Sequence, residues 1–99
     1  MKNDTTFADR VRKIVAKIPR GRVSTYKAIA AAAGNPRSAR AVGTIMKNNY
    51  SGKVPCHRVV HSDGTLGDYN RGGPKAKRAL LIQEGAFDKN GLLRFTVHR

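Results

Sequence analysis

Residues 24–48 read STYKAIAAAAGNPRSARAVGTIMKN, and this stretch decides the fold. The alanine-rich run predicts a helix over residues 25–33, with Ser24 as its N-cap and Gly34 as its C-terminal stop. An Asn-Pro pair then suits the start of a second helix over residues 35–48. Two short helices joined by a tight turn indicate a helix-turn-helix, although an ordinary helical hairpin packed in a core has the same pattern.

The segment before this stretch predicts one more helix. Thr6 and Asp9 have the spacing of a capping box, and Pro19 with Gly21 ends the helical pattern. The apolar residues between these signals fall on one helical face: Phe7, Val11, Ile14, Val15 and Ile18.

The segment after residue 52 is expected to contain strand, loop and helix. Residues 59–61 read as a short strand, residues 66–73 as a glycine-rich loop, and residues 74–84 as a helix that a glycine closes. A turn signal at residues 88–91 precedes apolar residues that alternate over 93–97, as in a strand. We therefore expect a mainly α, winged-helix-like domain with a helix-turn-helix, an active-site loop and a small β extension.

The length and the net charge of the chain restrict the classes of function that fit it. With 99 residues the chain is expected to be a single domain, residues 1–99. Lys and Arg number 20 against 6 Asp and Glu, and the formal net charge is +14, so a polyanionic partner is expected, nucleic acid first and an anionic membrane surface second. The chain has no apolar run near the roughly 20 residues of a spanning helix and does not begin like a signal peptide. We expect a cytoplasmic protein, or a nuclear one in a eukaryote, without a membrane partner.

The only cysteine lies in Pro55-Cys56-His57-Arg58-Val59. A free thiol is about 3% thiolate at pH 7, and each pKa unit that positive neighbours remove is worth about 1.4 kcal/mol, so this setting suits a nucleophile. The alternative is a small buried hydrophobe with the imidazole turned away. A metal site lacks enough ligands, because His61 and the distant His98 are the only other histidines. A Cys-His hydrolase would leave the positive charge unexplained.

This pentapeptide resembles the active-site motif of the O6-alkylguanine-DNA alkyltransferases, which move an alkyl group from damaged guanine to their own cysteine. The resemblance runs from about residue 7 to residue 85. Further blocks follow in a compatible order: Ile18–Tyr26 before the helix-turn-helix, Arg40–Gly43 in its second helix, Gly67–Tyr69 and Gly72-Gly73 in the pocket loop, and Glu84-Gly85 at the end of the last helix.

The resemblance implies four catalytic positions. Cys56 would be the nucleophile, and His57 would remove its proton through a water molecule. Glu84 would hold His57. Asn49 would tie the second helix of the helix-turn-helix to the active-site loop by hydrogen bonds, although Tyr50 stands where the family usually has proline.

The resemblance also implies residues that bind DNA and the damaged base. Arg40 would fill the space left by a nucleotide rotated out of the duplex, and Tyr26 would turn the 3′ phosphate and contact the base. Small side chains would let the second helix of the motif approach the minor groove closely, with little sequence preference: Ala39, Ala41 and Gly43.

In the pocket, the backbone of Val59 would help to hold guanine, and Tyr69 and Asn70 match the pocket loop. Asn70 stands where the family often has serine, and Arg71 looks like an insertion. Arg58 is expected to be structural.

The predicted function is DNA repair by irreversible, stoichiometric transfer from O6-alkylguanine to Cys56, the activity of a methylated-DNA–protein-cysteine S-methyltransferase. Such a protein needs no cofactor and no metal, acts as a monomer, and has double-stranded DNA containing O6-alkylguanine as its partner. Full family members carry an N-terminal ribonuclease-H-like domain that is not expected here.

Two alternatives stay open. Alkyltransferase-like proteins also lack that domain, bind lesions without transfer and hand them to nucleotide excision repair proteins. They usually have tryptophan in place of the cysteine. A transcription factor of the winged-helix kind is the other alternative.

Overall fold

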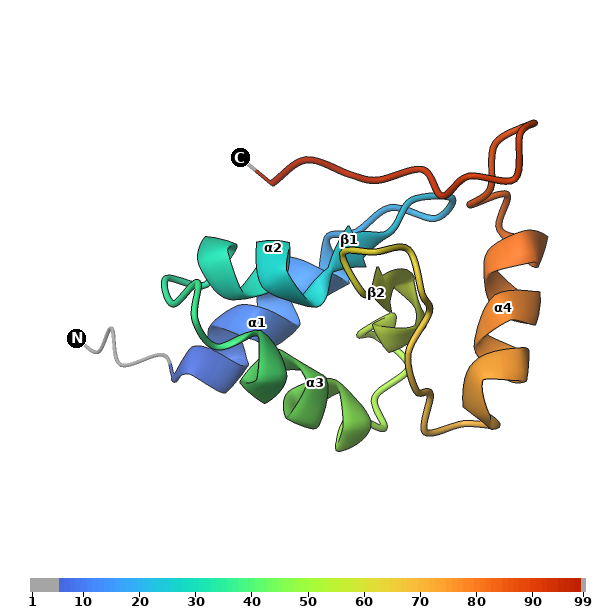
Figure 1. Ribbon diagram of the computed structural model, residues 1–99. Coiled ribbons are helices and arrows are strands. Elements are labelled where there is room, and N and C mark those ends of the chain that lie inside the picture. The colour runs from blue at the N-terminus through green and yellow to red at the C-terminus, as the bar shows by residue number, and fades with distance from the viewer. Residues whose placement is uncertain (1–5, 99) are drawn as a thin grey trace.

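The computed structural model describes residues 6–98. Its elements in chain order are α1 (Phe7–Ala16), β1 (Ser24–Thr25), α2 (Tyr26–Ala32), α3 (Ala39–Lys47), a 3-10 turn η1 (Cys56–Arg58), β2 (Val59–Val60) and α4 (Gly73–Gln83). Figure 1 shows α1, α2 and α3 grouped at one side and α4 at the other, with the two short strands between them. The prediction of a mainly helical domain with a small β element is confirmed.

The capping box that opens α1 is present. The Asp9 N–H donates to Thr6 Oγ1 over 3.0 Å, and the Thr6 N–H donates to Asp9 Oδ2 over 3.3 Å. This reciprocal pair satisfies two of the backbone donors that a helix start leaves free. The apolar face of α1 then enters the main core, where Val11, Val15 and Ile18 are buried against α2 and α3.

The helix-turn-helix is formed by α2 and α3, but both helices begin later than predicted. Thr25, not Ser24, caps α2, because its Oγ1 accepts the Ala28 N–H over 2.9 Å. Ser24 lies in β1 instead, where it is 1% exposed and paired with Val59.

The third helix begins at Ala39, so the predicted start at residue 35 is wrong. After Gly34 adopts φ +97°, the Asn35 N–H returns to the Ala30 carbonyl and ends α2. The Asn35 carbonyl then accepts the Ser38 N–H over 3.0 Å, which closes a turn at residues 35–38 before the helix starts. The proline therefore shapes the turn between the helices and is not the first residue of α3.

The strand predicted at residues 59–61 is present as β2, and its partner is β1. The two run parallel, with Ser24 opposite Val59 and Thr25 opposite Val60. This pairing joins the segment that carries Cys56 to the start of α2, two parts of the chain about thirty residues apart.

The last helix, α4, agrees with the predicted range to within one residue at each end and is closed by Gly85 at φ +74°. It packs over a second, smaller core made by Val23, Val60, Leu81 and Ala86.

The tail does not form the strand predicted over residues 93–97. Two isolated bridges remain, one between Val23 and Phe95 and one between Phe87 and Leu93. Among the described residues before the tail, the backbone of the tail pairs with Val23 alone, whose N–H donates to the Arg94 carbonyl and whose carbonyl accepts the Thr96 N–H. Leu92 and Val97 are exposed. No helix within residues 6–98 is both long and apolar enough to cross a bilayer.

Candidate active site and DNA-binding surface

Cys56 is a free cysteine at the first position of η1, and 7% of its surface is exposed. Pro55 precedes Cys56, and the Cys56 N–H donates to the Val54 carbonyl over 2.8 Å. These two features fix the backbone of the segment. Cys56 lies between two cavities of about 720 and 420 Å³, and together with Tyr69 it lines both. Cys56 therefore borders cavity space although the residue is buried.

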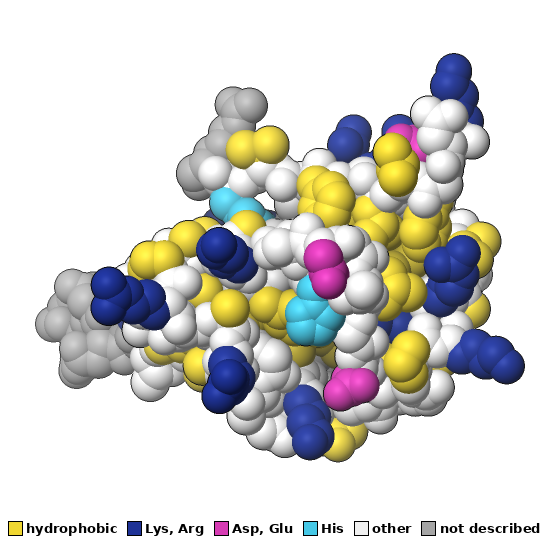
Figure 2. Space-filling view, in the orientation of Figure 1, with side chains coloured by type: hydrophobic (Ala, Val, Ile, Leu, Met, Phe, Trp, Pro, Cys, Tyr) yellow, Lys and Arg dark blue, Asp and Glu magenta, His cyan; other side chains and the backbone are white. Residues whose placement is uncertain are grey.

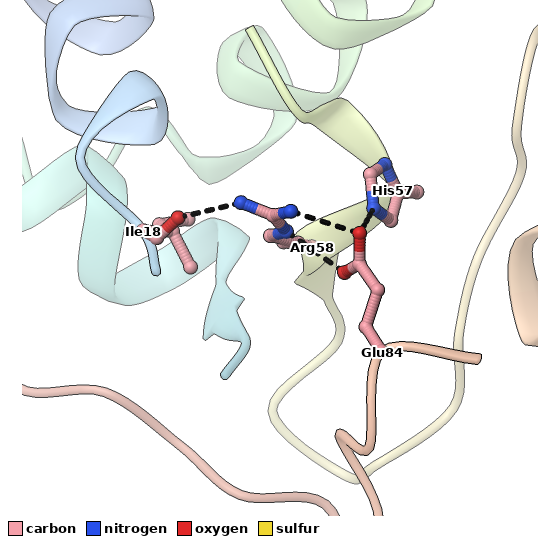
Figure 3. A network of polar contacts seen from close by, with 4 residues as sticks. All are labelled: Ile18, His57, Arg58 and Glu84. Atoms are coloured by element: carbon pink, nitrogen blue, oxygen red, sulfur yellow. Dashed lines mark hydrogen bonds and ion pairs between the residues drawn. The ribbon is translucent and has the colours of Figure 1, made fainter. Parts of the chain in front are cut away.

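Glu84 joins His57 to Arg58, the two residues that follow Cys56 (Figure 3). The His57 Nε2 lies 3.0 Å from Glu84 Oε2. The guanidinium of Arg58 donates to both carboxylate oxygens over 2.9 and 2.8 Å, and a third N–H of Arg58 donates to the Ile18 carbonyl over 2.8 Å. Arg58 thus links Glu84 to Ile18, which follows the end of α1, and Glu84 holds the imidazole of His57 in place.

These contacts set the charges at neutral pH. Partial burial would by itself raise the pKa of Glu84, but the hydrogen bonds from Arg58 and His57 lower that pKa to about 2. Burial lowers the pKa of His57 below its usual 6.5, and the hydrogen bond that His57 donates to Glu84 offsets this shift only in part. Glu84 is consequently ionised and His57 neutral at pH 7. With the Nε2 proton donated to Glu84, the imidazole Nδ1 is left as a proton acceptor.

The larger cavity collects most of the residues predicted to contact DNA or the base. They come from α2, α3, η1 and the loop before α4: Tyr26, Ala39, Arg40, Gly43, Cys56, Tyr69 and Asn70.

Five predicted residues lie elsewhere, and one of them, Asn49, is buried just after α3. His57 and Glu84 line the smaller cavity. Ala41 is on the exposed side of α3, and Val59 is completely buried in β2.

The phenol of Tyr26 lies deep in this region. The pocket loop approaches it closely at Gly67, where φ is +77° and a Cβ atom would lie 3.1 Å from Tyr26 Oη. Burial raises the pKa of Tyr26 to about 12, so its hydroxyl keeps its proton at neutral pH. On its other side the Lys77 ammonium donates to Tyr26 Oη over 3.3 Å.

Sequence reasoning missed Lys77. The spacing in the sequence was a signal of its position, since Lys77 lies one helical turn before Leu81 and therefore on the same face of α4. These two residues are the buried residues of α4. A lysine in an otherwise solvated helix is usually exposed, which is why the pattern was not informative without the fold.

Two asparagines hold the end of α3 and the active-site loop. The buried Asn49 donates from Nδ2 to the Val54 carbonyl over 3.1 Å and accepts the Ser51 N–H at Oδ1 over 3.3 Å. Asn70 donates from Nδ2 to the carbonyls of Lys47 and Asn49 over 2.8 and 2.7 Å. Asn70 therefore caps the C-terminus of α3 from the pocket loop, a role that its match to a family serine did not indicate.

The face of the molecule drawn in Figure 2 is mainly basic. Figure 2 shows Lys and Arg side chains scattered over the α1–α3 group and over α4, with only a few acidic side chains among them. Arg40 is exposed on α3 at the cavity, beside the half-buried Ala39 and Gly43. Among residues 6–98, no three His, Cys, Asp or Glu side chains are grouped so that they could hold a metal ion.

Comparison with known proteins gives consistent results. The family model described as "6-O-methylguanine DNA methyltransferase, DNA binding domain" matches residues 6–86. A methylated-DNA–protein-cysteine methyltransferase of Methanothermobacter thermautotrophicus is 46% identical over 82 residues, which are 82% of this chain and 45% of that protein. A DNA base-flipping protein of Escherichia coli is 42% identical over 88 residues, which are 86% of this chain and 66% of that protein.

The structure of Schizosaccharomyces pombe Atl1 bound to damaged DNA containing O6-carboxymethylguanine matches with a TM-score of 0.74 at 34% identity. That match covers 97% of this chain and 93% of the Atl1 chain. By contrast, this chain spans less than half the length of the archaeal methyltransferase.

Proposed function

Because the chain belongs to the 6-O-methylguanine DNA methyltransferase family, we propose that it repairs DNA by moving the alkyl group of an O6-alkylguanine to Cys56. The observation that carries this proposal is the position of the cysteine. Cys56 lines a cavity together with residues of α3, and the two residues that follow it belong to the fixed His57–Glu84–Arg58 network. A thiol nucleophile, a neutral imidazole and a cavity large enough to admit a base are the parts that such a transfer needs.

The damaged base must first leave the duplex, because stacking hides its O6 atom. Rotating a nucleotide out costs a few kcal/mol, and less for a mispairing base. Arg40 is exposed on α3 at the cavity, where it can enter the duplex and occupy the vacated position. The small Ala39 and Gly43 on the same helix leave room for DNA to approach.

The transfer then proceeds at the thiol. His57 takes the Cys56 proton through a water molecule, and Glu84 stabilises the imidazolium that forms. The thiolate attacks the alkyl carbon, so that the S–C bond forms as the C–O6 bond breaks and its electron pair stays on guanine. The guanine anion then accepts one proton from water, and His57 returns the proton of the thiol to water, so that the charges balance. The thioether is stable, and each protein molecule reacts once.

A second candidate function is lesion binding without transfer, with nucleotide excision repair proteins as downstream partners. The match to the structure of Atl1 bound to damaged DNA, with a TM-score of 0.74, favours this reading. The presence of Cys56 at the cavity favours transfer.

Counting lesions distinguishes the two functions. The protein is incubated with an equal amount of a duplex oligonucleotide that contains O6-methylguanine, and the remaining lesions are measured after digestion. We expect one lesion to disappear per protein molecule. Cys56→Ser is the matched control, because it keeps the shape of the side chain and should bind the duplex without repair. If the parent protein binds the duplex and leaves every lesion intact, lesion binding is the function.

A further inference from the structure

Asp68 is an acidic residue whose position the fold does not explain. Five of the six acidic residues of the chain lie within residues 6–98. The carboxylates of four of them accept hydrogen bonds from neighbouring groups: Asp9, Asp63, Glu84 and Asp88. Among the described residues, the Asp68 carboxylate accepts no hydrogen bond and forms no ion pair.

The pocket loop places this residue at the site of the proposed transfer. Asp68 is exposed, and it lines the larger cavity together with Cys56. The Lys77 ammonium donates to the Asp68 carbonyl over 3.2 Å, so the backbone of the residue is held in place. Burial, and after it the negative charge of Asp68, raise the pKa of Tyr26 to about 12. The carboxylate charge is therefore felt within the cavity.

A negative charge at this position opposes DNA binding. The chain as a whole has a net charge of +14, which attracts the phosphates of a duplex, whereas the Asp68 carboxylate repels them. A neutral residue in the exposed loop would avoid this repulsion. A carboxylate at the cavity is accounted for by a ligand that brings a hydrogen-bond donor to it.

The base of an O6-alkylguanine has one such donor. Alkylation at O6 removes the hydrogen atom from N1, so the exocyclic 2-amino group carries the remaining N–H bonds of the base. A hydrogen bond to an ionised acceptor is about twice as strong as one between neutral groups. We propose that Asp68 accepts a hydrogen bond from the 2-amino group of the rotated-out base and thereby selects lesions of guanine.

This contact rests on the proposed function, which brings the base into the larger cavity. It also predicts which lesions are disfavoured. Alkylation of thymine at O4 removes the hydrogen atom from N3, and the base then has no N–H bond at all. Such a base would leave the Asp68 carboxylate desolvated and without a donor, which lowers its affinity for the cavity.

Deleting the donor and the acceptor in turn tests the contact. A duplex with O6-methylhypoxanthine lacks the 2-amino group that a duplex with O6-methylguanine has. Asp68→Ala removes the carboxylate and keeps the backbone carbonyl that Lys77 contacts, and Asp68→Asn keeps an oxygen acceptor without the charge. Binding of both duplexes is measured in the Cys56→Ser background, where transfer does not interfere. The matched control is Asp63→Asn, which removes an exposed carboxylate that does not line the larger cavity.

The quantity to compare is the ratio of the dissociation constants of the two duplexes. We expect Asp68→Ala to reduce this ratio by roughly 10- to 100-fold, the effect of losing a hydrogen bond to a charged group. Asp68→Asn should have an intermediate ratio, and Asp63→Asn should change it by less than about threefold. The effect of the amino group on base pairing cancels, because the same two duplexes are bound by each protein.

An equal ratio in Asp68→Ala and its parent would overturn the proposal. Asp68 would then only repel phosphate, and its removal would tighten the binding of both duplexes to the same extent. An equal reduction of the ratio in Asp63→Asn and Asp68→Asn would overturn it as well, because the effect would then belong to the net charge and not to the cavity.

Methyl transfer with Cys56 present separates this contact from the proposed function. Asp68→Ala should reduce the preference for O6-methylguanine over O4-methylthymine in single-turnover rates, and an unchanged preference would contradict the proposed selection. If the ratio of dissociation constants depends on Asp68 but no methyl group is transferred from either base, the contact stands and the proposed transfer is wrong.

Discussion

Glu84 is the residue whose surroundings say most about the proposed chemistry. Both of its oxygens accept hydrogen bonds from Arg58, and one of them also contacts His57. Arg58 offsets much of the carboxylate charge, and the pKa of His57 stays below its usual value because burial outweighs the attraction of Glu84. The result is an imidazole that is neutral before the reaction and is stabilised by Glu84 once it takes a proton.

Glu84→Gln is expected to keep the thiol and the fold but to slow methyl transfer by roughly 10- to 1000-fold at pH 7, because a neutral amide no longer stabilises the imidazolium. The loss should shrink as the pH rises, since hydroxide then produces thiolate without help from His57. The rates of the two proteins should therefore be closer at alkaline pH than at pH 7. Single-turnover rates across this pH range provide the check. Parallel pH profiles would show that Glu84 takes no part in removing the proton.

Arg40→Ala is expected to impair extrusion of the damaged nucleotide more than it weakens DNA binding in general, because Arg40 lies at the cavity on α3. The matched control is Arg37→Ala, which removes an exposed cation in the turn before α3. A fluorescent base analogue beside the lesion reports extrusion, and titration with undamaged duplex reports general binding. Normal extrusion in Arg40→Ala, or equal effects of the two variants, would show that Arg40 only contacts phosphate.

At the residue scale, the sequence could indicate Cys56, His57 and Glu84 because a local motif and a helix end identify them. Lys77 and the capping role of Asn70 could not be predicted. Both depend on contacts between segments far apart in the chain, Lys77 with Tyr26 and Asn70 with the carbonyls after α3. No local pattern reports such contacts.

At the scale of elements, the pocket loop and the end of α3 act as one unit. Asn70 donates to the carbonyls of Lys47 and Asn49, and the neighbouring Arg71 donates to the Tyr50 carbonyl. Carbonyls at a helix C-terminus have no partner within the helix, so these bonds stabilise the end of α3 while they hold the loop over the cavity.

Asn70→Ala is therefore expected to lower the free energy of unfolding by about 1–3 kcal/mol, since it leaves carbonyls at the end of α3 without a partner. Amide exchange over residues 46–50 and in the pocket loop should accelerate together. Asn48→Ala is the matched control, because Asn48 is the exposed C-cap of α3 and its side chain makes no hydrogen bond among the described residues. Equal stability of the two variants, or faster exchange in one segment alone, would contradict the coupling.

The type of most elements was predictable from the sequence, but the residues at which the elements begin were less so. The capping box of α1 and the range of α4 follow from local signals and were predicted correctly. The starts of α2 and α3 were not, because Ser24 is needed in β1 and Asn35 in the turn that follows Gly34. The parallel pairing of β1 with β2 depends on the tertiary fold, and two-residue strands carry too little pattern to reveal a partner.

At the scale of the whole molecule, the net charge of +14 implies that DNA binding has a large electrostatic component. Each phosphate that a Lys or Arg neutralises should contribute about −0.9 to the slope of log affinity against log salt concentration. We expect a steep slope with undamaged duplexes and little difference among sequences. Titrations of several duplexes at a series of salt concentrations measure both quantities. A shallow slope, or a strong sequence preference, would favour the transcription-factor alternative.

The central claim is that Cys56 receives the alkyl group, and the mass of the intact protein tests it most directly. After incubation with a duplex that contains O6-methylguanine, the protein should gain one methyl group in place of a hydrogen atom, and peptide mapping should locate that methyl on Cys56. An excess of duplex should not increase the gain beyond one methyl per molecule. An unchanged mass under conditions where the protein demonstrably binds the damaged duplex would contradict the account.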